Sequence, residues 1–314
     1  MDRRPRVSFI ITAFDSARTL GQAVQSVLDQ DGPAIELIVV DDASQDRTPQ
    51  LLAAIRDPRL RVIRNRVNVG PFAAASRALD LARGDYVARL DADDLCLPAR
   101  TSKQLAFLHA HRQVGIVGSM CRQFDEQGTD LGLSVVQHHD LAIRWHLLLR
   151  SPFVHSTVMM RRRVLERHGL RYDPTLRVGG DYQLWTQLLR HTHGANLKSA
   201  LVRYRVWPGS ITGSQRAAQR VVQDRVSQQA IAEALPGFAI DAGELSDLRQ
   251  ALVPDPHRPV RPHFSSGRRA ALCALYRRLF EAFNQAQGAR PGIAVLRRQV
   301  ERRARQLAID GRDA

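Results

Sequence analysis

Three aspartates stand within four residues of one another at the point where an apolar run ends. Asp91, Asp93 and Asp94 belong to the stretch VARLDADDL. Carboxylates this close repel one another, and a cation between them relieves the repulsion. Mg²⁺ and Mn²⁺ prefer carboxylate oxygen, and such ions commonly take one or two protein carboxylates together with substrate phosphates and water. The Asp-x-Asp spacing therefore indicates a site for a divalent metal ion and a phosphorylated ligand.

Further aspartates occupy comparable places in the chain. Asp41 and Asp42 follow the apolar run from Ile35 to Val40, and Asp181 stands after two glycines in GGDYQLW, where a helix is expected to start. Each has a structural alternative, because aspartate often caps a helix or lies in a solvated loop. Taken singly, these residues do not decide between the alternatives.

The elements that must position these acids alternate between apolar strands and amphipathic helices. This order is typical of a mostly parallel sheet that is covered on both faces. Strands are expected at 7–11, 35–40, 60–63 and 86–90, and helices at 20–28, from an N-cap at Thr48 followed by Pro49, and at 71–83 with a stop at Gly84. Ligands of such sheets bind outside the carboxyl ends of the strands. The two acidic clusters should therefore face one crevice.

The second part of the chain has a different pattern. Residues 114–206 mix a short strand at Ser156–Met160, a helix that ends at Gly169 and a helix that begins near Asp181. Beyond Thr212 we expect long helices at 217–235, 243–253 and 270–307, with DPHRPVRPHFSSGRR as a linker. The sequence thus predicts a helical C-terminal extension.

Charge and composition limit the kinds of partner. Forty-six Lys and Arg against 31 Asp and Glu give a formal charge of +15, which favours an anionic partner such as phosphate, acidic glycan or a membrane face, or else reflects a solvated arginine-rich surface. The basic tail lacks interleaved aromatic residues, so nucleic acid is not expected. Three distant cysteines suggest no disulfide framework, and no segment resembles a secretory signal or a membrane span.

Six successive blocks of the sequence resemble the signature blocks of the large inverting glycosyltransferase family 2. The blocks are VSFIITAFDSARTLGQAVQSVLDQ, IELIVVDDASQDRT, NVGPFAAASRALDLARGDYVARLDADDLCLP, HSTVMMRRRVLERHGLRYDP, GGDYQLWTQLL and YRVWPGSIT, and they cover roughly residues 6–213. The resemblance implies an α/β fold of the GT-A type, which is a Rossmann-like domain with a mixed, mostly parallel sheet. It implies a catalytic domain over 1–213, with a nucleotide-binding half at 1–113 and an acceptor half at 114–213, followed by a helical extension at 214–314.

The resemblance also implies an activity and its reagents. The family transfers a sugar, here a hexosyl or N-acetylhexosaminyl group, from a nucleoside diphosphate sugar to a glycan or lipid-linked glycan, commonly in surface polysaccharide assembly. It implies a UDP-sugar donor, Mn²⁺ or Mg²⁺ as the cofactor, and a cytoplasmic enzyme. Contact of the basic tail with the cytoplasmic face of the membrane, and a homo-oligomer contact, are left open.

Residue roles follow from the same blocks. Asp181 resembles the catalytic base, Asp93 the metal ligand, and Asp91 a contact to the ion or the ribose, while Asp42 resembles the residue that reads the uracil ring. The nucleotide-binding set is Thr12, Ala13, Phe14, Asp15, Asp41, Asp42, Asn68, Gly70, Arg77 and Asp91. The acceptor-side set is His155, Trp185 and Trp207.

Three departures from the family pattern stand beside these matches. Gly180 replaces a glutamate before the base, Ala75 and Ser76 replace an arginine and an asparagine, and Trp207 replaces a histidine. Arg77 is the candidate for the missing cationic contact. The departures keep a second hypothesis open, in which a degenerate fold binds a nucleotide sugar or glycan without transferring it.

Overall fold

The computed structural model describes residues 4–32, 34–253 and 263–309. They form two compact units, which are described separately here. The first comprises Met1–Asp140 and Pro152–Ser210, and the second Leu141–Ser151 and Ile211–Ala314. The second unit therefore includes a short segment from the middle of the chain, which the sequence pattern did not predict.

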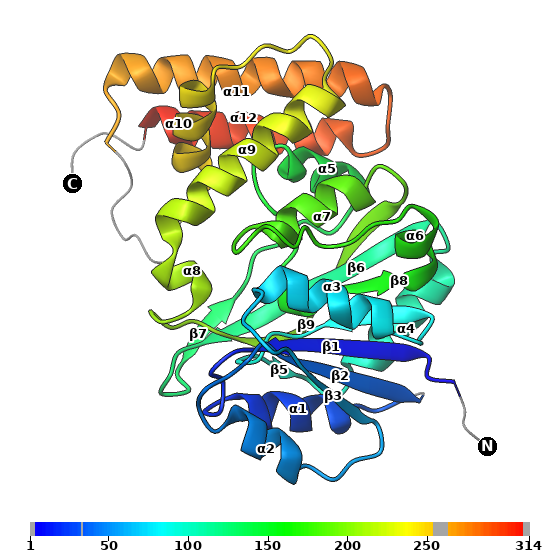
Figure 1. Cartoon of the computed structure of the whole chain (residues 1–314). Helices are drawn as coiled ribbons and strands as arrows, with labels where there is room; N and C mark the ends of the chain where they lie inside the picture. The colour runs from blue at the N-terminus through cyan, green and yellow to red at the C-terminus, as the bar shows by residue number, and fades with distance from the viewer. Residues whose placement is uncertain (1–3, 33, 254–262, 310–314) are drawn as a thin grey trace. The chain divides into compact units, whose positions relative to one another are not determined.

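The first part of unit 1 is a parallel sheet (Figure 1). Strands β3, β2, β1 and β4 lie side by side in that order and are parallel. The four strands span Leu60–Arg64, Ile35–Asp41, Val7–Ala13 and Tyr86–Arg89, and the connecting helices are α1 (Leu20–Leu28), α2 (Thr48–Ala54) and α3 (Pro71–Leu81). β2 is buried along its whole length. Its mostly apolar sequence is typical of a strand covered on both faces, and its buried Glu36 accepts from the Ser8 hydroxyl at 2.6 Å.

The same sheet continues through a mixed part, giving nine strands within the described residues. β8 (Met159–Arg161) runs antiparallel to β4, and β6 (Val114–Phe124) lies between β8 and β9 (His193–Arg205). β5 (Leu95–Cys96) pairs with β9, and β7 (Asp130–Leu133) pairs with β6. The helices of this part are α4 (Arg100–Ala110), α6 (Arg162–Arg167) and α7 (Gly180–Leu188).

Two local expectations were wrong. Thr48 is the first residue of α2 and not its cap: its N–H donates to Asp46 Oδ1, and its hydroxyl accepts from Ser16 N–H. The expected strand at Ser156–Met160 begins instead as a 3₁₀ turn, η1 (His155–Thr157), in which Thr157 N–H donates to the Val154 carbonyl. In this turn the Ser156 hydroxyl accepts a hydrogen bond from Asp91 N–H at 3.0 Å.

Unit 2 is a helical unit with its own apolar core. Its helices are α5 (Asp140–Leu147), α8 (Ile211–Ser214), α9 (Arg216–Ala234), α10 (Ala242–Leu252), α11 (Ser266–Gln287) and α12 (Ile293–Ile309). Trp145 of α5 packs against Tyr276, Phe280 and Phe283 of α11, which explains why 141–151 lies with the tail. Part of the expected linker, residues 255–262, lies outside the described residues. No helix in the described ranges has both the length and the apolar character needed to cross a bilayer.

Candidate active site

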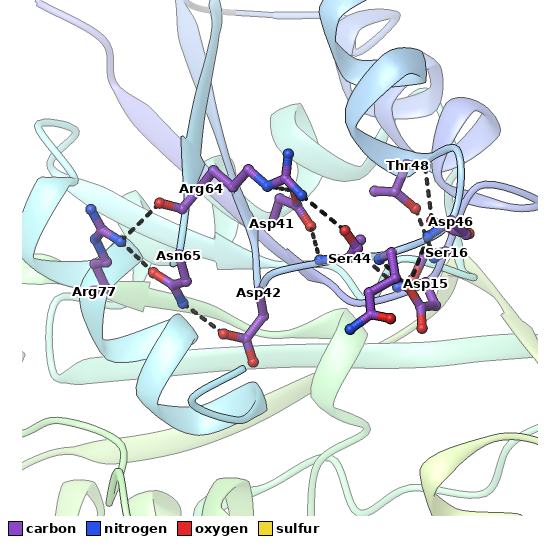
Figure 2. A network of polar contacts seen from close by, with 11 residues as sticks. Asp15, Ser16, Asp41, Asp42, Ser44, Asp46, Thr48, Arg64, Asn65 and Arg77 are labelled. Carbon is purple, nitrogen blue, oxygen red and sulfur yellow. Dashed lines mark hydrogen bonds and ion pairs between the residues drawn. The ribbon is translucent and has the colours of Figure 1, made fainter. Parts of the chain in front are cut away.

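The loops that follow β1 and β2 are bonded to each other (Figure 2). Asp15 has a left-handed backbone with φ of 46°, and its carboxylate accepts from Gln45 N–H at 2.7 Å and Asp46 N–H at 3.3 Å. Asp46 in turn accepts from Ala17 N–H at 3.0 Å. The Asp15 side chain therefore holds one loop on the other. Phe14, beside it, exposes 47% of its surface at the carboxyl end of β1, where a planar base could stack on its ring.

Asp42 anchors the loop that leads into α3. Its buried carboxylate accepts from Asn65 Nδ2 at 2.7 Å, Val69 N–H at 3.0 Å and Gly70 N–H at 2.7 Å. Arg77 donates to the side chain of the same Asn65 (Figure 2). The structure therefore brings the predicted nucleotide residues Asp42, Gly70 and Arg77 together.

Asp41, the neighbouring acid, has different partners. It forms an ion pair with Arg64, with 3.2 Å between Oδ2 and Nε, and accepts from Ser44 N–H at 3.0 Å. Ala13 is buried, and its carbonyl accepts from Asp42 N–H at 2.8 Å. The ends of β1 and β2 thus form one bonded edge, as the sequence indicates for a nucleotide site.

Arg89, which the sequence analysis did not single out, organises the acids at the end of β4. Its guanidinium is fully buried and donates to the Ile10 carbonyl at 3.1 Å and Thr12 Oγ1 at 3.4 Å. It also donates to Asp91 Oδ1 at 2.8 Å and His155 Nε2 at 3.2 Å. An arginine inside an apolar strand run was the available signal, since a buried charge is retained only with partners.

Asp91 and His155 form the centre of this network. His155 Nδ1 lies 3.4 Å from Asp91 Oδ1, and its Nε2 lies 3.0 Å from the Tyr172 hydroxyl. Burial raises the pKa of Asp91, but His155, Arg89 and the Ser156 hydroxyl together lower it well below the usual range. Asp91 is therefore ionised under all ordinary conditions.

Asp93 and Asp94 follow Asp91 in the sequence and have different partners. Trp207 Nε1 donates to Asp93 Oδ2 at 2.8 Å, and Arg205 N–H donates to Asp94 Oδ1 at 2.7 Å. Burial and the charge of Asp91 raise the pKa of Asp93, while burial and the two neighbouring carboxylates raise the pKa of Asp94 well above its usual range. The three acids repel one another, as their spacing predicts.

The donor set fits a hard divalent cation. Among the described residues, no group of three or more His, Cys, Asp and Glu is arranged to hold a metal ion. Asp93 and Asp91 nevertheless supply carboxylate oxygens, and two protein carboxylates completed by phosphates and water suit Mg²⁺. A cation at Asp93 would also offset the repulsion that raises its pKa.

Asp181 lies in the first turn of α7. Gly179, with φ of 69°, precedes the helix, and the helix start has no side-chain cap. Asp181 therefore does not cap α7, which removes that alternative. Burial raises the pKa of Asp181, the charge of His155 lowers it, and the charge of Asp91 raises it again. The neighbouring Gly180 packs on Phe72, whose ring lies 6.3 Å from that of His155.

The departure at Gly180 has a steric reason. A Cβ at this position would lie 2.7 Å from Cγ and Cδ2 of Phe72, closer than any carbon contact allows. Phe72 stacks on Tyr172, with 5.6 Å between ring centroids. The aromatic ring thus fills the space of the side chain that Gly180 lacks.

The three acceptor-side candidates lie at different depths. His155 is in the acid network, and Trp207 contacts Asp93. Trp185 is fully buried, with its ring centroid 6.2 Å from that of His155 and 6.4 Å from that of Tyr172. Trp185 therefore packs behind the rings of His155 and Tyr172, and it is not exposed to a ligand.

Comparisons with known proteins agree with this arrangement. The family model described as glycosyl transferase family 2 matches residues 8–169. The succinoglycan biosynthesis protein ExoO of Rhizobium meliloti is 36% identical over 200 residues, which are 60% of this chain and 57% of that protein. The Escherichia coli UDP-Glc:alpha-D-GlcNAc-diphosphoundecaprenol beta-1,3-glucosyltransferase WfaP is 28% identical over 211 residues, which are 67% of this chain and 80% of that protein.

Two solved structures share the fold. Staphylococcus aureus TarS 1–349 in complex with UDP-GlcNAc has a TM-score of 0.62 and 18% identity, covering 97% of this chain and 91% of that one. The mannosyltransferase PcManGT from Pyrobaculum calidifontis in complex with GDP-Man and Mn²⁺ has a TM-score of 0.56 and 19% identity, covering 99% and 88%.

The mixed, mostly parallel sheet with acids at its strand ends defines a GT-A fold followed by helices. The chain belongs to glycosyl transferase family 2.

Proposed function

We propose that this chain is an inverting, metal-dependent glycosyltransferase that uses a nucleoside diphosphate sugar. The observation that carries the proposal is the meeting of two acids distant in sequence. Asp91 lies two residues beyond the end of β4, and Asp181 lies in the first turn of α7. A chain of contacts joins them: Asp91 lies 3.4 Å from His155, the His155 ring lies 6.3 Å from that of Phe72, and Gly180 packs on Phe72. The charge of Asp91 accordingly raises the pKa of Asp181. A carboxylate that binds an anionic donor through a cation and a second one that removes a proton are what single-displacement transfer requires.

In this proposal Asp181 is the base. The acceptor hydroxyl oxygen forms a bond to the anomeric carbon while the bond from that carbon to the diphosphate oxygen breaks, and the hydroxyl proton passes to the Asp181 carboxylate. The diphosphate leaves with the bonding electron pair. A raised pKa suits this task, because a base is most effective when its pKa is close to the working pH.

Asp93 and Asp91 would hold Mg²⁺ or Mn²⁺ with the donor phosphates. When bound, the ion neutralises the charge that develops on the leaving diphosphate. Trp207 fixes Asp93 through the indole N–H, and Arg89 fixes Asp91, so both carboxylates are oriented before any ligand binds. A Mn²⁺-bound relative of the same fold supports this part of the proposal.

The proposed donor is a UDP-sugar and the proposed acceptor a glycan or lipid-linked glycan in surface polysaccharide biosynthesis. The names of ExoO and WfaP and the UDP-GlcNAc complex of TarS support this choice. The loop that Asp42 holds through Gly70 N–H and the exposed ring of Phe14 provide a place for the nucleobase of the donor.

The proposal is tested by measuring nucleotide release from UDP-glucose, UDP-galactose, UDP-GlcNAc and GDP-mannose with a panel of acceptors, in Mn²⁺, in Mg²⁺ and in EDTA. We expect Asp181→Asn to lower metal-dependent transfer by about 10²- to 10⁴-fold while donor binding persists. Asp80→Asn, on an exposed pair with Arg171, is the control. Equal activity of the two variants would contradict the proposed base, and donor binding without release in the wild type would favour the non-catalytic binding protein.

A further inference from the structure

The arginines around the acid cluster are already engaged. Arg89 is committed to Asp91 and His155, and Arg64 to Asp41. Arg205 donates to the Asp93 carbonyl and stacks its guanidinium on Phe124, 4.5 Å from the ring centroid. A diphosphate arriving beside three carboxylates would need positive charge from elsewhere in addition to the metal ion.

Helix α3 does not supply that charge at its start. Ala74 and Ala75 are fully buried and apolar. Arg77, the residue that the sequence analysis proposed as the missing cation, donates to the Arg64 carbonyl and to Asn65. Its guanidinium is therefore used to hold the loop that Asp42 anchors.

Arg177 occupies a different position, over the loop that begins α3. Its Nη1 donates to Asn68 Oδ1 at 2.8 Å. A Cβ on Gly70, whose φ is 97°, would lie 2.5 Å from the same Nη1 and 2.9 Å from Cζ. The guanidinium thus lies directly on Asn68 and Gly70, two predicted nucleotide residues, and only a glycine permits this approach.

Arg177 also has unused capacity for an anion. The side chain is exposed, and across the described ranges no carboxylate lies within ion-pair distance of it. A guanidinium carries five N–H donors in a fork that matches phosphate oxygens, and the neutral amide of Asn68 uses only part of that capacity.

Arg177 connects the loop at Asn68 and Gly70 with the turn that carries Asp181, the proposed catalytic base. It stands four residues before Asp181, across Gly179 and Gly180, and Gly180 packs on Phe72 of α3. Gly70, under the guanidinium, is itself held by Asp42. The contact therefore spans the nucleotide loop and the turn that carries the proposed base.

We propose that Arg177 binds the diphosphate of the donor and thereby fixes the 177–181 turn that presents Asp181. The proposal rests on the proposed function, since it names the donor phosphates as the anion. In this assignment the cationic contact that Ala75 and Ser76 no longer provide comes from Arg177 in the 177–181 turn, and not from Arg77.

The test compares a nucleotide with its own nucleoside. Isothermal titration of the full chain in Mg²⁺ buffer gives the affinities of UDP and uridine, and of GDP and guanosine, for the wild type, Arg177→Gln, Arg177→Lys and the control Arg171→Gln. Arg171 pairs with Asp80, at 2.7 Å, away from this loop. The nucleoside lacks the phosphates, so it reports base and ribose binding alone.

We expect Arg177→Gln to weaken binding of the nucleoside diphosphate by about 10- to 100-fold, the usual loss for a charge-assisted hydrogen bond, with nucleoside affinity unchanged. Arg177→Lys should lie between, because lysine keeps the charge without the fork. Equal weakening of nucleotide and nucleoside, or no weakening of either, would overturn the assignment. If the wild type binds neither UDP nor GDP, the proposed function itself fails, and the assignment fails with it.

Discussion

The substitution Gly180→Ala isolates the steric contact between the base-bearing turn and α3. The added Cβ would lie 2.7 Å from Phe72 Cγ and Cδ2 and 3.0 Å from Cδ1, whereas carbon atoms pack at about 3.5–4.0 Å. Overpacking of this kind costs roughly 1–3 kcal/mol. Alanine gains up to about 1 kcal/mol over glycine in a helix interior, and less at the first helical position. We therefore expect Gly180→Ala to lower the free energy of unfolding by about 1–2 kcal/mol.

A double-mutant cycle with Phe72→Ala separates the clash from the change in helix propensity. Alanine at position 72 lacks Cγ, Cδ1 and Cδ2, the atoms that the new Cβ would meet, so the double variant should recover about 1–2 kcal/mol relative to the sum of the single variants. Urea titration of the four proteins gives these free energies from the transition midpoints, provided that the slopes agree.

Gly21→Ala is the matched control. Gly21 lies in α1, and a Cβ there would be 3.5 Å from Leu51 Cδ1, an ordinary contact. This change should raise stability by about 0.5–1 kcal/mol. Additive effects of Gly180→Ala and Phe72→Ala would refute the steric explanation for the glycine before Asp181.

Three other outcomes are expected. Because burial raises the pKa of Asp181, the protonated carboxyl makes a contribution to folding that is fully present below pH 3.8 and is lost as pH rises through the raised pKa. Thermal melts of Asp181→Asn should therefore match or exceed the wild type at pH 7.5, and the wild type should gain on the variant as pH falls toward 3.8. The transfer rate should fall in acid with an apparent pKa above 3.8, the ordinary aspartate value, and a pH–rate profile without that limb would contradict the base. Asp42→Asn places an amide against three donors, from Asn65, Val69 and Gly70, so it should lower the free energy of unfolding by about 1–3 kcal/mol. It should also weaken nucleoside binding in the isothermal titration, and unchanged binding would show that this loop does not contact the nucleotide.

Much of the fold and of the site can be read from local patterns. Mostly apolar runs predict β1, β2 and β4, because strands covered on both faces are rich in apolar residues. Acids at the ends of parallel strands predict one shared crevice for the two acidic clusters, which stays a prediction, while Asp42 at the end of β2 accepts from Gly70 N–H. The family resemblance added Asp181, which lies in the first turn of α7 and whose pKa the charge of Asp91 raises.

Other features depend on contacts between residues that no local pattern connects. Arg89 joins β4 to His155, 66 residues later, and Trp207 reaches Asp93 across 114 residues. Phe72 decides that position 180 must be glycine, and Trp145 decides that 141–151 packs with the tail. Local periodicity records only which face of an element is apolar, whereas the partner of each side chain is set by how distant elements pack. The sequence by itself determined the strands and the acids at their ends, and the tertiary structure alone decided which side chains hold those acids in place.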